Sequence, residues 1–270
     1  MPAHDGEART DVGEWFYHLP VVWMSVVVLA LTLLASGVIH AVVMRLATGD
    51  RARAFKAMSP VMLTPLAVIF GLIVAFLASQ VWLDVERATN AVIREANALR
   101  TVVVLAAHFP QEQQARIRSF VRRHIQKAVD EEWPAMAHRR MNLPLISAGY
   151  TEGLELVLAI VPANEAQVVA QREMVASLQN AFEARRQRII ISESTINEVK
   201  WAVVGLLAAL LLVTVAIVHS DNRHTAALSM GILSVAIAAS VVLIAAHNRP
   251  FTGQISVGPA LLIQVLPEDK

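Results

Sequence analysis

The sequence has 270 residues, of which 56% are hydrophobic and only 17% charged, and its net charge is +1. A soluble domain carries about 25% charged residues, so this composition, with a mean hydropathy of +0.52, indicates a membrane protein. The near-zero net charge provides no field that would attract nucleic acid, and the absence of cysteine excludes disulfides, thiolate nucleophiles and Cys-ligated metal sites.

Four stretches are long and apolar enough to cross a bilayer, which takes roughly 20 residues. They are residues 21–44, 61–83, 201–218 and 225–246, and none of them contains a charged residue. An amphipathic soluble helix would show a polar residue every three or four positions, and these stretches do not. The sequence therefore predicts an all-α membrane protein with four transmembrane helices in two pairs.

These spans divide the chain into five parts. A polar N-terminal segment (1–20) precedes the first transmembrane pair (21–83), and a soluble helical domain (84–200) separates it from the second pair (201–246). The C-terminal tail (247–270) contains several prolines and glycines, so we expect it to be extended or hairpin-like.

Two long helices are expected to join the membrane spans to the soluble domain, because glycine and proline are absent over long runs. The first continues from the second span to about His108, and the second runs from Ala163 to Val204, directly into the third span. Beyond the membrane, the apolar residues of the first helix recur at intervals of three and four, which is typical of a coiled-coil seam: Val85, Ala88, Val92, Ala96, Leu99, Val103 and Ala106. The soluble part is thus predicted to be an antiparallel helical bundle continuous with the membrane helices.

One charge falls on the apolar seam of the second long helix. Arg185 lies between Phe182 and Ile189, where an unpaired guanidinium would be strongly unfavourable. The acidic residues Glu131 and Glu132 end the preceding helix, so a buried salt bridge from one of them to Arg185 or Arg188 is expected. We predict that Arg185 forms this structural charge pair. We also expect Arg185→Ala to destabilise the protein more than Arg188→Ala. The alternative is that these charges form an ion-binding or gating site.

A helix that begins at Gln111 carries basic residues on one face: Arg116, Arg118, Arg122, Arg123 and Lys127. This face could attract anions to a vestibule or contact anionic lipid headgroups. Alternatively, it is an ordinary solvated helix face. No histidine spacing of a metal site, Gly-rich phosphate loop or catalytic arrangement accompanies it, so we expect no enzymatic activity, no cofactor and no metal.

Four local patterns resemble a known family. They are Glu95-Ala96-Asn97-Ala98-Leu99, Glu131-Glu132-Trp133-Pro134, Ala184-Arg185-Arg186-Gln187-Arg188, and the tail Pro250-Phe251-Thr252-Gly253 with Ser256, Val257 and Pro259. In this order, together with the spans, they resemble the bestrophin-like family of bacterial membrane proteins. The sequence departs from the family pattern at Asn248, where an acidic residue is expected, and before Trp201, where a proline is expected.

The resemblance implies a homo-oligomeric anion-channel fold, through the family's more distant similarity to bestrophins. The second span would then line the pore, and spacings of four, three and four place Ile69, Ile73, Phe76 and Gln80 on one face of it. An apolar ring of this kind can gate by dewetting. Alternatively, this face packs against neighbouring spans.

We therefore expect a bestrophin-like ion channel, with small inorganic anions, membrane lipids and further copies of the chain as partners and no nucleic acid. The alternative function is a membrane-anchored helical scaffold or interaction module without transport activity. The expected location is the bacterial inner membrane, which the chain crosses several times. The distribution of Lys and Arg near the spans does not decide the orientation of the chain in the membrane. The resemblance implies that the soluble domain and both termini lie in the cytoplasm.

Overall fold

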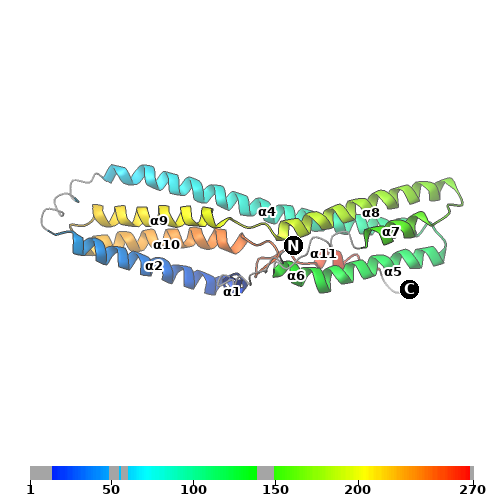
Figure 1. Ribbon diagram of the computed structural model, residues 1–270, viewed down its shortest axis with the longest axis horizontal. Helices are drawn as coiled ribbons and strands as arrows, with labels where there is room; N and C mark the ends of the chain where they lie inside the picture. The colour runs from blue at the N-terminus through cyan, green and yellow to red at the C-terminus, as the bar shows by residue number, and fades with distance from the viewer. Residues whose placement is uncertain (1–13, 49–54, 56–59, 139–148, 268–270) are drawn as a thin grey trace, which may run out of the picture. The chain divides into compact units, whose positions relative to one another are not determined.

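A computed structural model describes residues 14–48, 55, 60–138 and 149–267, and every regular element in these residues is helical (Figure 1). Four helices are long and apolar enough to cross a membrane: α2 (Val21–Leu46), α4 (Leu63–Ala106), α9 (Glu198–Val218) and α10 (Arg223–His247). The prediction of an all-α membrane protein with four spans is confirmed.

The chain divides into two compact units. We call Met1–Val81 with Ile196–Asn248 the membrane unit, and Trp82–Thr195 with Arg249–Lys270 the helical unit. The sequence places the soluble domain at 84–200, so the observed boundaries lie within five residues of the expected ones. The tail does not stand apart, however, because it belongs to the helical unit.

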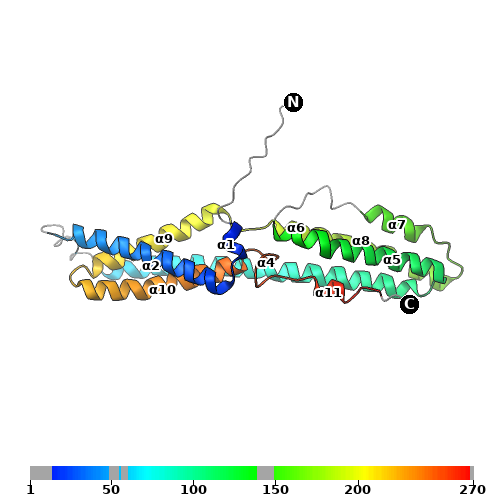
Figure 2. The same ribbon diagram turned by 90° about the horizontal axis from the view of Figure 1, so that it is seen from below.

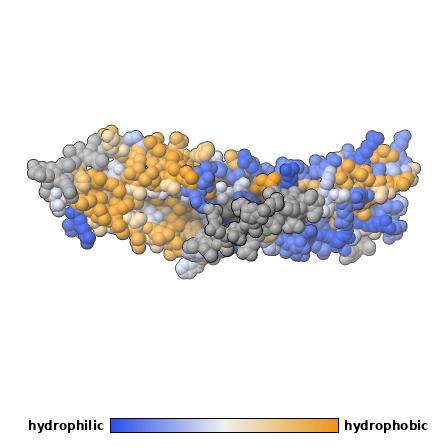
Figure 3. Space-filling view, in the orientation of Figure 1, coloured by the Kyte–Doolittle hydropathy of each residue, from blue (hydrophilic) through white to orange (hydrophobic). Residues whose placement is uncertain are grey.

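The membrane unit packs α2, α9 and α10 together with the first half of α4. Its main buried cluster includes Leu77 and Val81 of α4, Leu211 of α9, and Met230 and Ile237 of α10. Apolar residues also cover the outside of this unit on the face shown in Figure 3. In the most apolar 18 residues of the second span, only 11% of the residues are buried inside the structure. The corresponding share is 17–33% in the other three spans. The outward surface of α4 must therefore be covered by lipid or by another chain.

Helix α4 is a single helix of 44 residues, starts just after a 3₁₀ turn (Pro60–Met62), and ends at Ala106, two residues before the expected end. Its last part joins α5 (Gln111–Lys127) and α8 (Glu165–Ser192) in the helical unit. Both views show α5 and α8 running alongside this part of α4 in the opposite direction (Figures 1 and 2).

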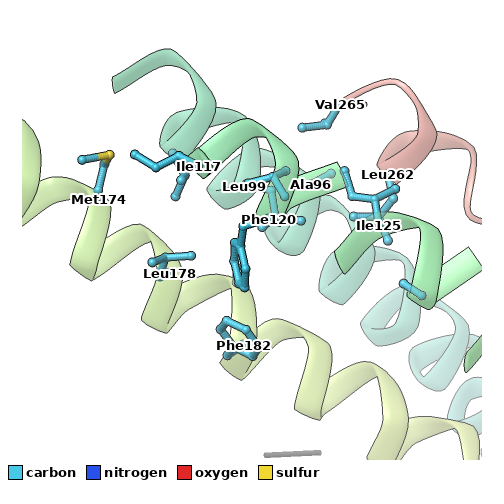
Figure 4. Packing of buried hydrophobic residues seen from close by; sticks show 14 of the residues in the cluster. Ala96, Leu99, Ile117, Phe120, Ile125, Met174, Leu178, Phe182, Leu262 and Val265 are labelled. Carbon is cyan, nitrogen blue, oxygen red and sulfur yellow. The ribbon is translucent and has the colours of Figure 1, made fainter. Parts of the chain in front are cut away.

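The core of the helical unit is apolar and closely packed. Phe120 of α5 and Phe182 of α8 lie side by side within it (Figure 4). The short helix α7 (Tyr150–Leu158) approaches this core through Gly153, where an added Cβ would lie 2.6 Å from the ring of Phe120. Only glycine permits so close an approach.

The prediction of one helix from Ala163 to Val204 is wrong. Helix α8 ends at Ser192 and α9 begins at Glu198. The intervening residues include Ser194, Thr195 and Asn197, whose side chains compete for backbone hydrogen bonds and favour helix ends. The side chain of Asn197 caps α9 by accepting from the Val199 amide at 2.9 Å. Polar capping residues therefore end this helix without glycine or proline.

The predicted extended or hairpin-like tail is also wrong. It contains turns and a short helix, α11 (Ala260–Ile263), and no strand occurs between Arg249 and Pro267. Phe251, Leu262 and Val265 are buried in the core of the helical unit. The tail adopts this form because it buries apolar side chains against helices instead of pairing with a second strand.

Candidate functional site: a buried charge network

Four charged side chains meet inside the helical unit. Glu95 comes from α4, Glu132 from the π-helical turn η2 (Ala128–Glu132), and Arg185 and Arg188 from α8. Their exposed fractions are 0% for Glu95 and Arg188, 2% for Arg185 and 5% for Glu132. We refer to these four residues as the charge network.

Arg188 is the centre of the charge network. Its Nε donates to Glu95 Oε2 at 2.8 Å, and its Nη2 donates to Glu95 Oε1 at 3.2 Å and to Glu132 Oε2 at 2.9 Å. Arg185 binds the other oxygen of Glu132, donating to Oε1 from Nε at 2.9 Å and from Nη2 at 2.7 Å. Arg188 therefore connects α8 to both α4 and η2, and Arg185 connects α8 to η2.

Local structure explains how the sequence places these groups. Arg185 and Arg188 are three residues apart on α8, so they lie on the same helix face. The wider π turn at η2 directs Glu132 inward and leaves Glu131 exposed. Glu95 occupies an inward position on α4, between the buried residues Val92 and Leu99.

An aromatic ring and a histidine surround the charge network. The ring of Trp133 lies 4.3 Å from the guanidinium carbon of Arg188, a cation–π geometry. Trp133 Nε1 also donates to the carbonyl of Val257 at 3.0 Å, which connects the network to the tail. His124 Nε2 lies 3.3 Å from Glu95 Oε1.

The pKa values of three of these groups, Glu95, Glu132 and Arg188, are shifted in the direction that favours the charged form. Glu95 lies in the helical unit, beyond the apolar part of α4. Burial acts to raise the pKa of Glu95, but the charge of Arg188 and the hydrogen bonds from His124 and Arg188 outweigh it and hold the pKa at about 2. Burial also disfavours the charged forms of Glu132 and Arg188, but their ion pairs outweigh it. The pKa of Glu132 is therefore lowered and the pKa of Arg188 is raised. Two carboxylates and two guanidinium groups leave the network neutral.

We expect the protein to lose stability in acid through Glu95. Its pKa is depressed in the folded state from an ordinary value of 4.5 to about 2. The stabilisation is therefore complete above pH 4.5 and disappears as the pH falls toward 2. The melting temperature of the wild-type protein should therefore drop between pH 4.5 and 2. The Glu95→Gln variant should have a lower melting temperature at neutral pH, and that temperature should change less as the pH falls. Equal acid slopes in the two proteins would contradict this assignment.

The structure contains the predicted charge pair between Arg185 and one of the two carboxylates. Of the two candidate carboxylates, Arg185 binds Glu132, and Glu131 lies on the surface. The sequence predicts a smaller loss of stability for Arg188→Ala than for Arg185→Ala. In the structure, however, Arg188 is completely buried and binds two carboxylates. Sequence reasoning did not assign a role to Glu95. The sequence does contain a pattern that could have identified Glu95 as a residue that needs a partner, because Glu95 lies within an apolar seam as Arg185 does.

The basic residues of α5 do not form one free cationic surface. Arg116 pairs with Glu112 at 2.6 Å and Arg123 with Glu152 at 2.5 Å. Arg122 donates to the carbonyl of Pro267 at 2.7 Å, so it holds the tail. The remaining two differ in exposure: Arg118 is partly buried and Lys127 is exposed.

The predicted pore residues of α4 differ in their exposure. Ile69 and Phe76 point away from the rest of the membrane unit, with exposed fractions of 49% and 65%. Ile73 packs partly against the buried cluster. Gln80 is half-buried, and its Oε1 accepts a hydrogen bond from Lys200 Nζ at 2.7 Å.

A cavity of about 330 Å³ lies beside the charge network, and His124, Lys127, Glu132 and Arg185 contribute to its wall. Among the residues that the structure describes, no group of three or more His, Asp or Glu side chains is placed to hold a metal ion. The charge network joins α4, η2 and α8 through its ion pairs.

The model of the bestrophin-like domain matches residues 26–262 of this sequence. The chain belongs to the bestrophin-like family. The crystal structure of a membrane protein shares the same fold with this bestrophin-like chain: the TM-score is 0.66 at 11% sequence identity, over 90% of this chain and 96% of the other. No curated protein matches the sequence. Family, fold and the four apolar helices together identify an integral membrane protein.

Proposed function

We propose that this bestrophin-like protein is a homo-oligomeric, anion-conducting channel, and that α4 lines its pore. The observation that carries the proposal is the division of α4 into two faces. Phe70, Leu77 and Val81 pack into the membrane unit, whereas Ile69 and Phe76 are 49% and 65% exposed. A pore built by several copies needs one outward apolar face from each copy.

The remaining parts of the proposal concern the setting of the channel. Its partners are small inorganic anions, membrane lipids and further copies of the chain, and it carries out no enzymatic reaction. The helical unit and both termini lie in the cytoplasm of a bacterium, with the spans in the inner membrane. The family resemblance supports this orientation.

The direct test is chloride flux through liposomes that contain the purified full-length protein. We expect flux above that of empty liposomes, together with an oligomer in detergent. An intact oligomer without any flux would reject the channel and favour the scaffold function, in which the spans only tether the helical unit.

Phe76→Ala tests the pore face. Shortening an apolar side chain at a constriction makes the pore wet more easily, so we expect about a tenfold higher chloride flux, equivalent to a barrier about 1.4 kcal/mol lower. Leu228→Ala is the matched control, because Leu228 lies on α10, is 68% exposed and loses a similar apolar volume. Equal chloride fluxes in Phe76→Ala and Leu228→Ala would contradict the proposal that α4 lines the pore.

A further inference from the structure

A lysine is bound to the proposed pore face of α4. Lys200, in the first turn of α9, donates from Nζ to Gln80 Oε1 at 2.7 Å. The apolar stretch of α4 from residue 63 to 83 contains no charged residue of its own. Lys200 therefore brings a positive charge to a helix face that otherwise has none.

The position of Gln80 defines where this charge lies. Ile69, Ile73, Phe76 and Gln80 follow one another at intervals of four, three and four, so they stay on one side of the helix. Phe76, which is 65% exposed, precedes Gln80 by about 6 Å along the axis. The ammonium group of Lys200 is thus held about one turn beyond the exposed aromatic ring.

The hydrogen bond holds the charge without cancelling it. The acceptor is a neutral amide, whereas a carboxylate at the same place would neutralise the ammonium group. The next acidic residue along α4 is Asp84, which pairs with Arg87 at 3.2 Å. The amide of Gln80 fixes the position of the lysine, and the positive field of Lys200 remains.

We propose that Lys200, positioned by Gln80, makes the pore prefer small inorganic anions to cations. This inference rests on the proposed channel function and adds the residue that determines charge selectivity. A unit charge about 6 Å from a passing ion in water changes the local ion concentration by about threefold. Each copy of the chain in an oligomer contributes one such charge. Salt screens the effect, since the Debye length falls from about 10 Å at 0.1 M to 3 Å at 1 M.

The test measures the reversal potential of the purified full-length protein in planar bilayers under a potassium chloride gradient. Lys200→Gln should lower the chloride-to-potassium permeability ratio at least about threefold near 0.1 M salt, and by much less near 1 M. Lys200→Arg keeps the charge and should retain the wild-type ratio. Gln80→Glu should neutralise Lys200 and lower the ratio in the same direction, which keeps the test valid if Lys200→Gln folds poorly.

The control is Arg223→Gln, which removes one positive charge at the start of α10. Because α9 separates the two residues, the rise of an α-helix places Arg223 about 30 Å from Lys200. Arg223→Gln should leave the permeability ratio unchanged. If Lys200→Gln and Gln80→Glu conduct with the wild-type ratio, the inference is wrong and the channel function stands. A lower melting temperature with an unchanged ratio would make Lys200 a structural anchor. A wild-type protein that passes no ions would overturn both proposals.

Discussion

Arg188→Ala is expected to reduce the free energy of unfolding by about 3–5 kcal/mol, the usual cost of removing one partner from a buried ion pair. The loss is large because two carboxylates depend on this residue. Among the residues that the structure describes, Glu95 then keeps its contact with His124, and Glu132 keeps Arg185. Both carboxylates then remain buried without adequate compensation.

The measurement is thermal unfolding of the full-length protein in detergent, with yield of folded protein as a second readout. Arg185→Ala should cost less than Arg188→Ala, because Glu132 still binds Arg188 and Glu95 is untouched. Arg116→Ala is the control: Arg116 makes one surface pair, worth at most about 0.5 kcal/mol. A larger loss for Arg185→Ala than for Arg188→Ala would restore the order expected from the sequence.

Trp133→Ala is expected to cost about 3–5 kcal/mol, as large aromatic deletions in cores do. The indole fills the space between Arg188 and Phe251, with ring centroids 6.1 Å apart in the Trp133–Phe251 pair. Its removal leaves a cavity beside a buried charge and breaks the hydrogen bond to Val257. We therefore expect a lower melting temperature and faster proteolysis of the tail.

Trp133→Phe separates packing from hydrogen bonding. It keeps an aromatic ring over Arg188 and loses the N–H donor, so its cost should be intermediate, with about 1 kcal/mol from the hydrogen bond. Leu158→Ala is the matched surface control, because Leu158 is 62% exposed on α7. If Trp133→Ala melts like Leu158→Ala, the indole does not hold the tail.

The charge network separates what a linear pattern can predict from what it cannot. Arg185 stands out in the sequence because a charge in an apolar seam requires a partner. Glu95 and Arg188 are 93 residues apart. Their bond depends on how α4 and α8 pack and on the π turn that directs Glu132, and neither feature follows from local spacing.

The same distinction applies to the departures from the family pattern. Asn248 replaces an expected acidic residue, and the helix break before Trp201 lacks the expected proline. In the structure these two sites meet, because the Oδ1 of Asn248 accepts from the amide of Ile196 at 2.9 Å within the broken segment. An amide oxygen can accept this hydrogen bond as a carboxylate would. The partner of Asn248 lies far along the chain, so reading each departure separately does not reveal it.

The sequence by itself determined the membrane class and the four spans, because a run of about 20 apolar residues must be helical in lipid. It also determined that α4 continues beyond the membrane, because glycine and proline are absent from residue 72 to 109. It also marked Arg185 as a residue that needs a partner. Only the tertiary structure decided that Arg188 is the centre of the charge network, that α8 and α9 are separate helices, and that the tail packs into the helical unit. These features depend on contacts between distant residues, whose free energy comes from desolvation and packing in the assembled core.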